Sequence, residues 1–565
     1  MLKSIRAELE IYNDIIKETT ITTTVTAGST YDTTVDRVNY FDNKFPIDWT
    51  SAETASNREI NTTIRFTFDK AQAVVGMRLY GNVSKADYRY IDSTNMVIKG
   101  WTSPQDASNG VNFGSYSNGE QYSPGIKKIE IKVTELATDD EHAHLDYVQF
   151  LVVEDISPDK LFDITANKAM SYVADETNGG DFTLLYNKDK SDIWRDTSQN
   201  AIKDIPETIT KNKICSIFVS TDTENDILFY KYITTNIVEE DGDIRIEGID
   251  ILTLLNETTY QKGIVYENGR SLYDWAVDVV NDIQLINPNA TSVDIDTSLQ
   301  DIISYGYITE VSHREALRLI AEAGNVYLFV DKRGYISLSR DYRDSYDGIY
   351  QVKTSVTENS LSVEGAENIQ GIIVNKYRYF PQNYAVELGY IESVVLTNEY
   401  QHFDIVYAQY PVKNNTVQLF YNGTNIQVAN FHAYADRVEF DIKGDVGQST
   451  FITVVGIPYD TANTTVSVGN TAQNTKEIKD NYLIGDYEFD DTNHAQWIAD
   501  NQFDLLSNKY VYSWEDVTAD LLFAPNEVNF FYEGYKDLSS LLLLTSIEIS
   551  MSDSDESISI TGLTR

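Results

Sequence analysis

Residues 312–340, SHREALRLIAEAGNVYLFVDKRGYISLSR, predict a helix that is followed directly by a β-hairpin. Ser312 and Glu315 form an S-x-x-E capping box, a pattern that satisfies the first backbone N–H groups of a helix. Gly324 is the expected end of this helix, because glycine tolerates the left-handed conformation that stops one. The apolar residues between them recur at helical spacing and define one buried face: Ala316, Leu317, Ile320 and Ala321.

The hairpin follows from two apolar runs on either side of a polar connection. Residues 326–330 and 335–339 alternate as strands do, and the four residues DKRG lie between them. Gly334 ends this connection, where hairpin turns favour glycine. Helix and hairpin are therefore expected to form one compact unit.

Length and composition predict a multidomain chain that is mainly β, with α+β insertions. The chain has 565 residues, of which 42% are hydrophobic, and it contains 39 Tyr and 22 Phe against 10 Pro. This length exceeds that of a single domain, and the aromatic content favours packed strands over disorder. The one cysteine, Cys215, lies in the apolar run ICSIFVS, so we expect a buried structural thiol.

The charge of the chain argues against nucleic-acid binding. A formal net charge of −43 leaves too little positive charge to displace counterions from a phosphate backbone. Acidic residues on solvent-exposed surfaces account for this charge. The charge would also suit the lining of a tube through which DNA passes, because such a lining must not bind phosphates. The sequence has no apolar run long enough for a membrane span and no apolar signal segment at the N-terminus.

Four zones separate along the chain and give the expected domains: 1–157, a β-sandwich; 158–265, a first β-barrel; 266–370, an α+β domain; and 371–565, a second barrel with an inserted β region at about 384–475. The first zone shows period-two alternation, as in Ile64, Phe66 and Phe68. In the second, Asp241 and Gly242 predict a tight turn. A capped helix is expected from Ser271, a strand at 371–380 and a helix at 492–508.

Several of these blocks resemble hub proteins from the tail tip or baseplate of tailed bacteriophages. The family, which includes the hub part of tail-associated lysins and prophage endopeptidase tail proteins, carries a "T-x-R-E-x-L-x-x-I-A-x-x-x-G … D-x-x-G-x-[IL]" stretch, matched here from His313 to Leu338. IEGIDILTLL resembles the family's end of the first barrel, and GIIVNKYRYF its entry into the second. Asn481, Leu483 and Ile484 match its "I-x-N-x-L-I" block, which the segment Trp497–Leu506 follows.

The resemblance implies a structural virion protein, assembled in the host cytoplasm, that closes the distal end of the tail tube. It implies a homotrimer whose two tube-type barrels per subunit form a pseudo-hexameric ring. The implied partners are a distal tail ring or tail tube protein, the tape-measure protein, and tail fibres or receptor-binding proteins. Such a hub is a platform for host attachment and DNA passage. Some family members continue into a lysin domain, for which this chain is expected to leave no room.

A carbohydrate-binding adhesin is the alternative hypothesis. Segments of the first zone, such as HLDYVQFLVVED, resemble discoidin-like, galactose-binding domains. Aromatic residues in stretches of this zone that read as loops, together with one arginine, suit the recognition of a host surface glycan. These candidate carbohydrate-binding residues are Trp49, Tyr88, Arg89, Tyr90, Trp101 and Tyr116. Core or interface positions are the alternative interpretation of the same residues.

We expect no catalytic, metal or cofactor site. Paired acidic residues such as Glu239 and Glu240 are frequent by chance in so acidic a chain. His142 and His144 form an H-x-H pair, but a polar strand entry explains them better than a metal site does. No Walker A, G-x-S-x-G or H-E-x-x-H motif is present. The sequence therefore predicts a binding or structural protein rather than an enzyme.

Overall fold

A computed structural model of the protein gives its fold. It describes residues 2–12, 21–25, 45–54, 58–72, 74–100, 104–108, 112–114, 126–137, 142–169, 179–187, 195–196, 201–202, 213–221, 227–240, 243–286, 293–331, 334–340, 350–352, 360–366, 368–489, 492–507, 509–515, 527–532, 538–552 and 556–564.

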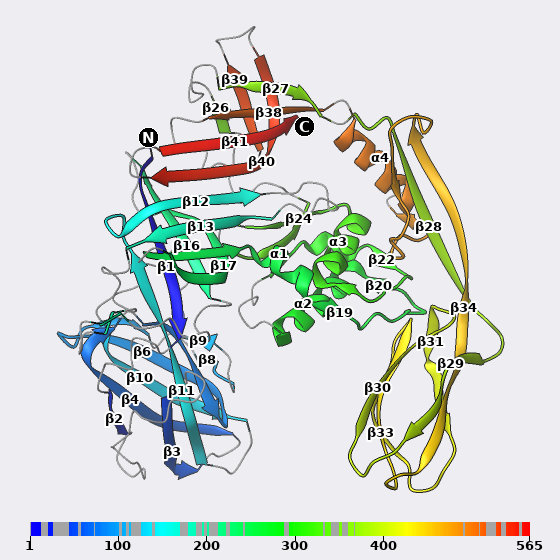
Figure 1. The fold of residues 1–565 in the computed structure, drawn as a ribbon, viewed down its shortest axis with the longest axis horizontal. Helices are drawn as coiled ribbons and strands as arrows, with labels where there is room; N and C mark the ends of the chain where they lie inside the picture. Colours follow the sequence, from blue (N-terminus) through cyan, green and yellow to red (C-terminus); the bar gives the residue numbers. More distant parts are fainter. Residues whose placement is uncertain are drawn as a thin grey trace. The chain divides into compact units, whose positions relative to one another are not determined.

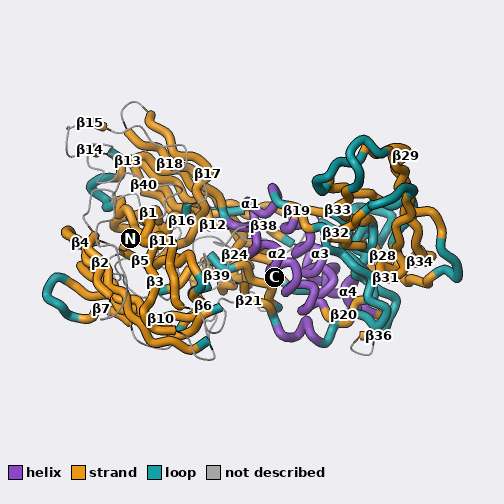
Figure 2. The backbone as a smooth tube through the Cα atoms, turned by 90° about the horizontal axis from the view of Figure 1, so that it is seen from below, coloured by secondary structure: helices purple, strands orange, loops and turns teal. Residues whose placement is uncertain are grey.

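Strands dominate the described residues, and the α-helices belong to one of two compact units (Figure 2). The first unit contains Met1–Ala166, Asp181–Ile249 and Ile549–Ser557, and the second contains Asn167–Gly180, Asp250–Glu548 and Ile558–Arg565. The predicted class, mainly β with α+β insertions, is confirmed. The four predicted domains stay a prediction. Within the described ranges, no helix combines the length and the apolar character that a bilayer-spanning segment requires.

In the first unit, a long sheet runs in the order β13-β18-β17-β16-β1-β11-β5-β9, with β3 also paired to β11. β1 is central because it pairs antiparallel with both β16 and β11. Cys215 lies on β16 with no exposed surface, as predicted. Glu240 on β17 pairs with Asp243 on β18, and the expected turn residues between them lie outside the described residues.

A second sheet of this unit, β2-β4-β10-β6-β7, packs on part of the first. Phe66 and Phe68 of β4 make edge-to-face contacts with Phe150 of β11, at centroid distances of 5.2 and 5.5 Å. All three rings are buried. The period-two alternation that the sequence shows therefore places the inward residues of both sheets in one core, as in a β-sandwich. Its discoidin-like character stays a prediction.

The strands in the first part of the chain are β1 (Leu2–Tyr12), β2 (Ile21–Val25), β3 (Phe45–Thr54), β4 (Glu59–Gln72), β5 (Val74–Gly81), β6 (Val83–Asp92), β7 (Val97–Gly100), β8 (Gln105–Asp106), β9 (Asn112–Phe113), β10 (Ile126–Leu136), β11 (His142–Ile156), β12 (Leu161–Ala169), β13 (Asp181–Tyr186), β14 (Arg195–Asp196), β15 (Ala201–Ile202), β16 (Ile214–Thr221), β17 (Ile227–Glu240) and β18 (Asp243–Ile249).

The elements that follow, up to the hairpin, are α1 (Ile251–Leu254), η5 (Leu255–Glu257), β19 (Thr259–Tyr260), β20 (Arg270–Ser271), α2 (Leu272–Ile286), β21 (Val293–Ile295), η6 (Thr297–Gln300), β22 (Ile303–Ser304), β23 (Val311–Ser312), α3 (His313–Gly324), β24 (Tyr327–Val330) and β25 (Ile336–Ser339).

The remaining elements are β26 (Tyr350–Val352), β27 (Ser362–Gly365), β28 (Gly371–Pro381), β29 (Val386–Val395), β30 (Gln401–Val406), β31 (Val412–Tyr421), β32 (Gln427–Ala433), β33 (Arg437–Lys443), β34 (Ser449–Gly469), β35 (Thr475–Ile478), β36 (Glu488–Phe489), β37 (Thr492–Asn493), α4 (His494–Leu506), β38 (Tyr510–Glu515), β39 (Glu527–Tyr532), β40 (Leu538–Ser552) and β41 (Glu556–Thr564).

The helices of the second unit begin where the sequence predicts. Ser312 caps α3, its Oγ accepting a hydrogen bond from the Glu315 N–H at 3.1 Å. The Ser271 Oγ accepts one from the Asp274 N–H at 3.0 Å at the start of α2. The end of α3 is shifted by one residue, because Asn325, with φ of 46°, takes the left-handed position expected of Gly324. Gly324 is instead buried within the last turn.

An inserted sandwich lies between β28 and the second half of β34. Its two sheets are β29-β34-β31 and β30-β33-β32. Leu388, Val438, Phe440, Ile452 and Val454 belong to the fully buried core between the two sheets. β34 is the link, because its first half belongs to the sandwich and its second half pairs antiparallel with β28, from Gly371↔Gly469 to Pro381↔Tyr459 (Figure 1).

The strands at the end of the chain pair with one another and with two short strands that precede β28. Their order is β27-β38-β41-β40, and β39 pairs with both β26 and β40. Ile547, Ile560 and Trp514 of these strands are buried.

A glycine allows close contact between two distant segments of the second unit. A Cβ added to Gly306 would lie 1.8 Å from the carbonyl oxygen of Tyr482. The backbone cannot yield easily there, because the Ser304 Oγ donates a hydrogen bond to the neighbouring Leu483 carbonyl at 2.8 Å. This contact therefore requires a residue without a side chain.

We expect Gly306→Ala to lower the free energy of unfolding by about 2 kcal/mol or more, because it forces these segments apart. Urea unfolding followed by tryptophan fluorescence measures the loss. Gly365→Ala is the matched control, since a Cβ at Gly365 meets nothing within 4 Å. Equal stability of the two variants would contradict the close packing.

Candidate functional site

The sequence blocks that resemble the hub family meet in one place. We call this place the α+β body and define it by α1–α3, the hairpin β24–β25, the strand β28 and residues 481–506. These parts are spread along the chain from residue 251 to residue 506. Their contacts are the geometry on which a functional interpretation depends.

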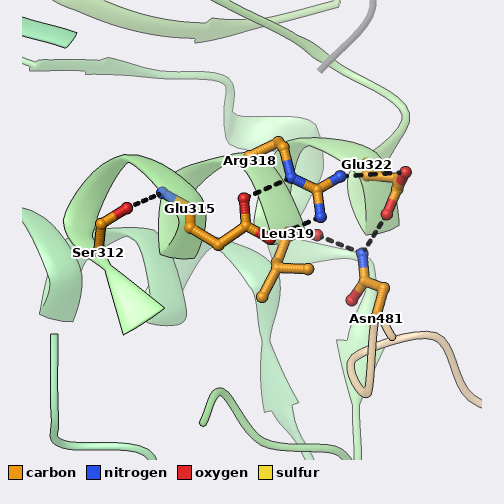
Figure 3. A network of polar contacts seen from close by, with 6 residues as sticks. All are labelled: Ser312, Glu315, Arg318, Leu319, Glu322 and Asn481. Carbon is orange, nitrogen blue, oxygen red and sulfur yellow. Dashed lines mark hydrogen bonds and ion pairs between the residues drawn. The ribbon is translucent and has the colours of Figure 1, made fainter. Parts of the chain in front are cut away.

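Asn481 joins the last of these blocks to α3 (Figure 3). Its Nδ2 donates to the Leu319 carbonyl oxygen at 2.8 Å and to Glu322 Oε2 at 2.9 Å. The side chain is buried, as is that of Glu322. Arg318 pairs with Glu322 at 3.4 Å and with Glu315 at 2.7 Å, so the carboxylate that Asn481 contacts is fixed from the helix side as well.

The residues around Asn481 pack as the block predicts. Leu483 and Ile484 have no exposed surface. Tyr482 stacks on Tyr307 with ring centroids 5.1 Å apart and an interplanar angle of 10°. The Tyr379 hydroxyl, from β28, donates to the Tyr482 carbonyl at 3.2 Å. One short segment therefore contacts α3, the loop before it and β28.

Helix α4 belongs to the same body and contacts α3 through its first residue. His494, in its first turn, is buried, and its Nε2–H donates to the Ala323 carbonyl of α3 at 2.7 Å. The ring stacks on Tyr487 at 4.7 Å between centroids. Burial lowers the pKa of His494 to about 4, and the hydrogen bond to Ala323 offsets only part of this shift. The imidazole is therefore neutral at pH 7.

A second buried histidine, His313, stands at the start of α3. Its Nε2 lies 3.0 Å from Asp282 Oδ2, and its Nδ1 lies 2.9 Å from Thr258 Oγ1. Burial raises the pKa of Asp282, but hydrogen bonds from His313 and Lys262 outweigh it and hold the pKa below its ordinary value. The order Thr–His–Asp resembles a catalytic triad. However, the His313 side chain has no exposed surface, so the arrangement links α2, η5 and α3 instead.

The sequence did not predict that His313 and His494 are buried and connect neighbouring elements. His313 is part of the matched stretch, but its partners Thr258 and Asp282 lie 55 and 31 residues upstream. No local pattern links such positions. His494, in the first turn of α4, belongs to no local sequence pattern either.

Arg437 fixes the inserted sandwich to the α+β body. Its side chain is 1% exposed, and it pairs with Glu310 at 2.8 Å and donates to the Gln261 carbonyl at 2.8 Å. The neighbouring Asp436 accepts a hydrogen bond from the Glu310 N–H at 3.1 Å. Burial raises the pKa of Asp436 above its ordinary value, although this hydrogen bond and Arg437 lower it.

An open cavity of about 400 Å³ lies beside this junction. Val311, Leu319, Val406, Tyr410 and Tyr482 give it apolar and aromatic walls, and its polar lining includes Glu310, Glu315, Asp436 and Asp480. Glu310, Glu315 and Asp436 already have the partners given above. Among all the residues that the structure describes, no group of three or more His, Cys, Asp or Glu side chains could hold a metal ion.

The candidate carbohydrate-binding residues of the first zone do not form one exposed cluster in the part that the structure describes. Tyr88, Arg89 and Tyr90 lie on strand β6, so the expectation of a loop there is wrong. The Tyr88 and Tyr90 rings are buried, and the Tyr90 hydroxyl donates to the Gly114 carbonyl at 2.7 Å. Arg89 points to the opposite face and donates to Glu130 at 2.7 Å.

The other candidates are less informative. Trp49 lies on strand β3, opposite Leu145 of β11, whereas Trp101 and Tyr116 lie outside the described residues. His142 and His144 stand on β11, where His144 pairs with Asp146 at 3.1 Å. Glycan binding by the first zone stays a prediction.

No protein-family model matches the chain, and no curated protein matches its sequence. Its structure is similar to that of a tail protein from Neisseria meningitidis MC58, with 8% identity and a TM-score of 0.39, over 73% of this chain and 93% of that one. A 43 kDa tail protein of prophage MuSo2 from Shewanella oneidensis has 12% identity and a TM-score of 0.36, over 71% and 94%.

A third similar structure is the prophage tail protein gp18 from Listeria monocytogenes EGD-e. It has 5% identity and a TM-score of 0.35, over 72% of this chain and 90% of that one. TM-scores and identities of this size do not establish a common fold.

We expect Asn481→Ala to lower the free energy of unfolding by about 2 kcal/mol or more, because it leaves the buried Glu322 carboxylate and the Leu319 carbonyl without this donor. Chemical unfolding measures the change. Asn463→Ala, on the exposed part of β34, should change stability by less than about 0.5 kcal/mol. A loss of similar size in both variants would contradict the role of Asn481.

We expect His494 to make the protein sensitive to acid. Its pKa of about 4 in the folded state lies below the value of 6.5 for an unperturbed histidine. The unfolded state therefore takes up a proton first, and stability falls as the pH decreases from about 6.5 towards 4, by up to about 3 kcal/mol.

His494→Gln keeps a donor for Ala323 and removes this titration, so its stability should decrease less over the same pH range. Unfolding curves at several pH values give the comparison. His432→Gln, at an exposed position on β32, is the control variant and should follow the profile of the parent protein. Identical pH profiles for His494→Gln and the parent would count against the assignment.

Proposed function

We propose that the chain is a structural protein of a tailed-bacteriophage virion, the hub that closes the distal end of the tail tube. One observation carries the proposal. The sequence blocks that resemble the hub family, although spread over residues 246–506, assemble into one α+β body in which matched residues make connecting contacts. Asn481 is the clearest example, since it is the asparagine of the family's "I-x-N-x-L-I" block and hydrogen-bonds α3, the helix of the 313–338 block.

The contacts of the body suit a mechanical role. Its polar groups connect elements: Asn481 with α3, His494 with α3, His313 with α2, and Arg437 with the inserted sandwich. Two further parts of the chain are connected to the body: the inserted sandwich and the strands that follow α4. A rigid body is needed to fix the positions of both parts. We infer that the chain acts by assembly rather than by catalysis.

Trimerisation belongs to the proposal. Three copies that each contribute two similar β-rich parts present six similar surfaces, which allows a three-fold object to bind a six-fold tube without mismatch. A distal tail ring or tail tube protein, the tape-measure protein and tail fibres are the proposed partners. The net charge of −43 fits a channel wall that does not retain phosphates while DNA passes.

The experiment that tests this proposal measures mass and shape together. We expect light scattering to give about three times the chain mass of 64.1 kDa, and negative-stain images of the same peak to show a three-fold ring. Gold-labelled antibodies against the chain should bind the distal tail of particles that carry it. A monomer at high concentration, or label on the capsid, would contradict the proposal.

A further inference from the structure

The two outer faces of the inserted sandwich differ in character. On the β30-β33-β32 sheet, polar side chains pair with one another: His402 with Asp441 at 2.9 Å, and Asn430 with Asp441 at 2.6 Å. On the β29-β34-β31 sheet, large aromatic side chains are exposed instead. Tyr390 is 65% exposed, Phe420 50% and Phe451 44%.

Strand register places these three rings on one face. Tyr390 of β29 and Phe420 of β31 both pair with Thr453 of the central strand β34. Phe451 lies two residues along β34 from Thr453 and therefore points to the same side. The neighbours Ile452 and Val454 point into the core and have no exposed surface.

Hydrogen-bonding groups lie among the rings. Glu387 and Gln418 both pair with Val455, so they form the next row of the same face, and both are exposed. Thr453 stands between Tyr390 and Phe420. These rows combine flat apolar surfaces with hydroxyl, amide and carboxylate groups and contain no basic side chain.

We propose that this face binds a neutral, β-linked oligosaccharide. The rings of Tyr390 and Phe420 stand two strand spacings apart, about 10 Å, which is on the order of the length of a disaccharide. Each ring can cover the apolar face of one sugar, while Glu387, Gln418 and Thr453 bind hydroxyl groups. A flat sheet suits an extended β-linked chain better than a coiled α-linked one.

Size and charge argue against other occupants. With the adjoining rows of Val395 and Ser449 at one end and Lys413 and Ile457 at the other, the face covers on the order of 450 Å², whereas a stable protein partner needs about 800 Å² on each side. A second copy of so acidic a chain would also place Glu387 near a like charge. For the same reason an acidic glycan or a nucleic acid is disfavoured, which leaves a small neutral ligand. The inference does not depend on the hub proposal, because it concerns only the sandwich.

The test uses the full chain and two neutral β-1,4-linked probes, cellohexaose and chitohexaose, with α-linked maltohexaose for comparison. Calorimetry and saturation-transfer NMR should detect millimolar or tighter binding of at least one β-linked probe. Tyr390→Ala with Phe420→Ala should weaken that binding on the order of tenfold or more, because both stacking surfaces are lost.

Tyr384→Ala is the matched control, since Tyr384 is also 65% exposed but lies outside the face, and it should bind as the parent does. Circular dichroism checks that the double variant is folded. No binding of either β-linked probe at millimolar concentration would overturn the proposal, as would full binding by the double variant, which would place the glycan elsewhere. A change in oligomeric mass in the double variant would assign the face to a second copy instead.

Discussion

The hydrogen bonds from Asn481 to α3 are the interaction on which the second unit depends. They are made in a buried place where water cannot replace them, so the segment after the inserted sandwich has only one register against the helix. Once Asn481 is fixed, Tyr482 stacks on Tyr307, Leu483 accepts from Ser304, and α4 follows with His494 against Ala323. A single side chain thereby orients the elements on both sides of it.

The insertion explains why such a fixed point is needed. Between β28 and Asn481 the chain leaves the α+β body, forms a sandwich with a core of its own and returns along β34. Bringing the two ends of so long an insertion together costs conformational entropy, and the contacts of the returning strand must offset this cost. The whole of β28 pairs with the second half of β34, and Arg437 of the sandwich contacts Glu310 and Gln261. Both sets of contacts limit the conformational freedom of the inserted segment. The sandwich is held at two places and has one outer sheet face of exposed aromatic residues.

Local signals predicted the local structure. The caps at Ser312 and Ser271, the apolar faces of α2 and α3 and the two arms of the hairpin are set by neighbouring residues, and the structure has them where the sequence placed them. Contacts between distant residues could not be predicted in this way. The links from His313 to Asp282 and from Arg437 to Glu310 follow from the tertiary arrangement, and neither pair stands in a recognisable pattern.

The same limit applies to predicting which aromatic residues are exposed and could bind a carbohydrate. Aromatic residues in the first zone attracted attention because they stand near polar residues, yet Tyr88 and Tyr90 lie on the inward face of β6 and are buried. Tyr390, Phe420 and Phe451 are far apart in sequence, and only the register of three strands brings them to one face. Exposure of an aromatic ring depends on which face of a sheet is covered, and single-sequence alternation does not determine that.

Native-state hydrogen exchange tests the central claim, that the matched blocks form one body, most directly. If α3, β28 and α4 unfold together, their slowest amides open with the same free energy and respond equally to low concentrations of denaturant. The account predicts this common value, including for amides beside Asn481. Much faster exchange in residues 481–506 than in α3, with a separate denaturant dependence, would contradict it.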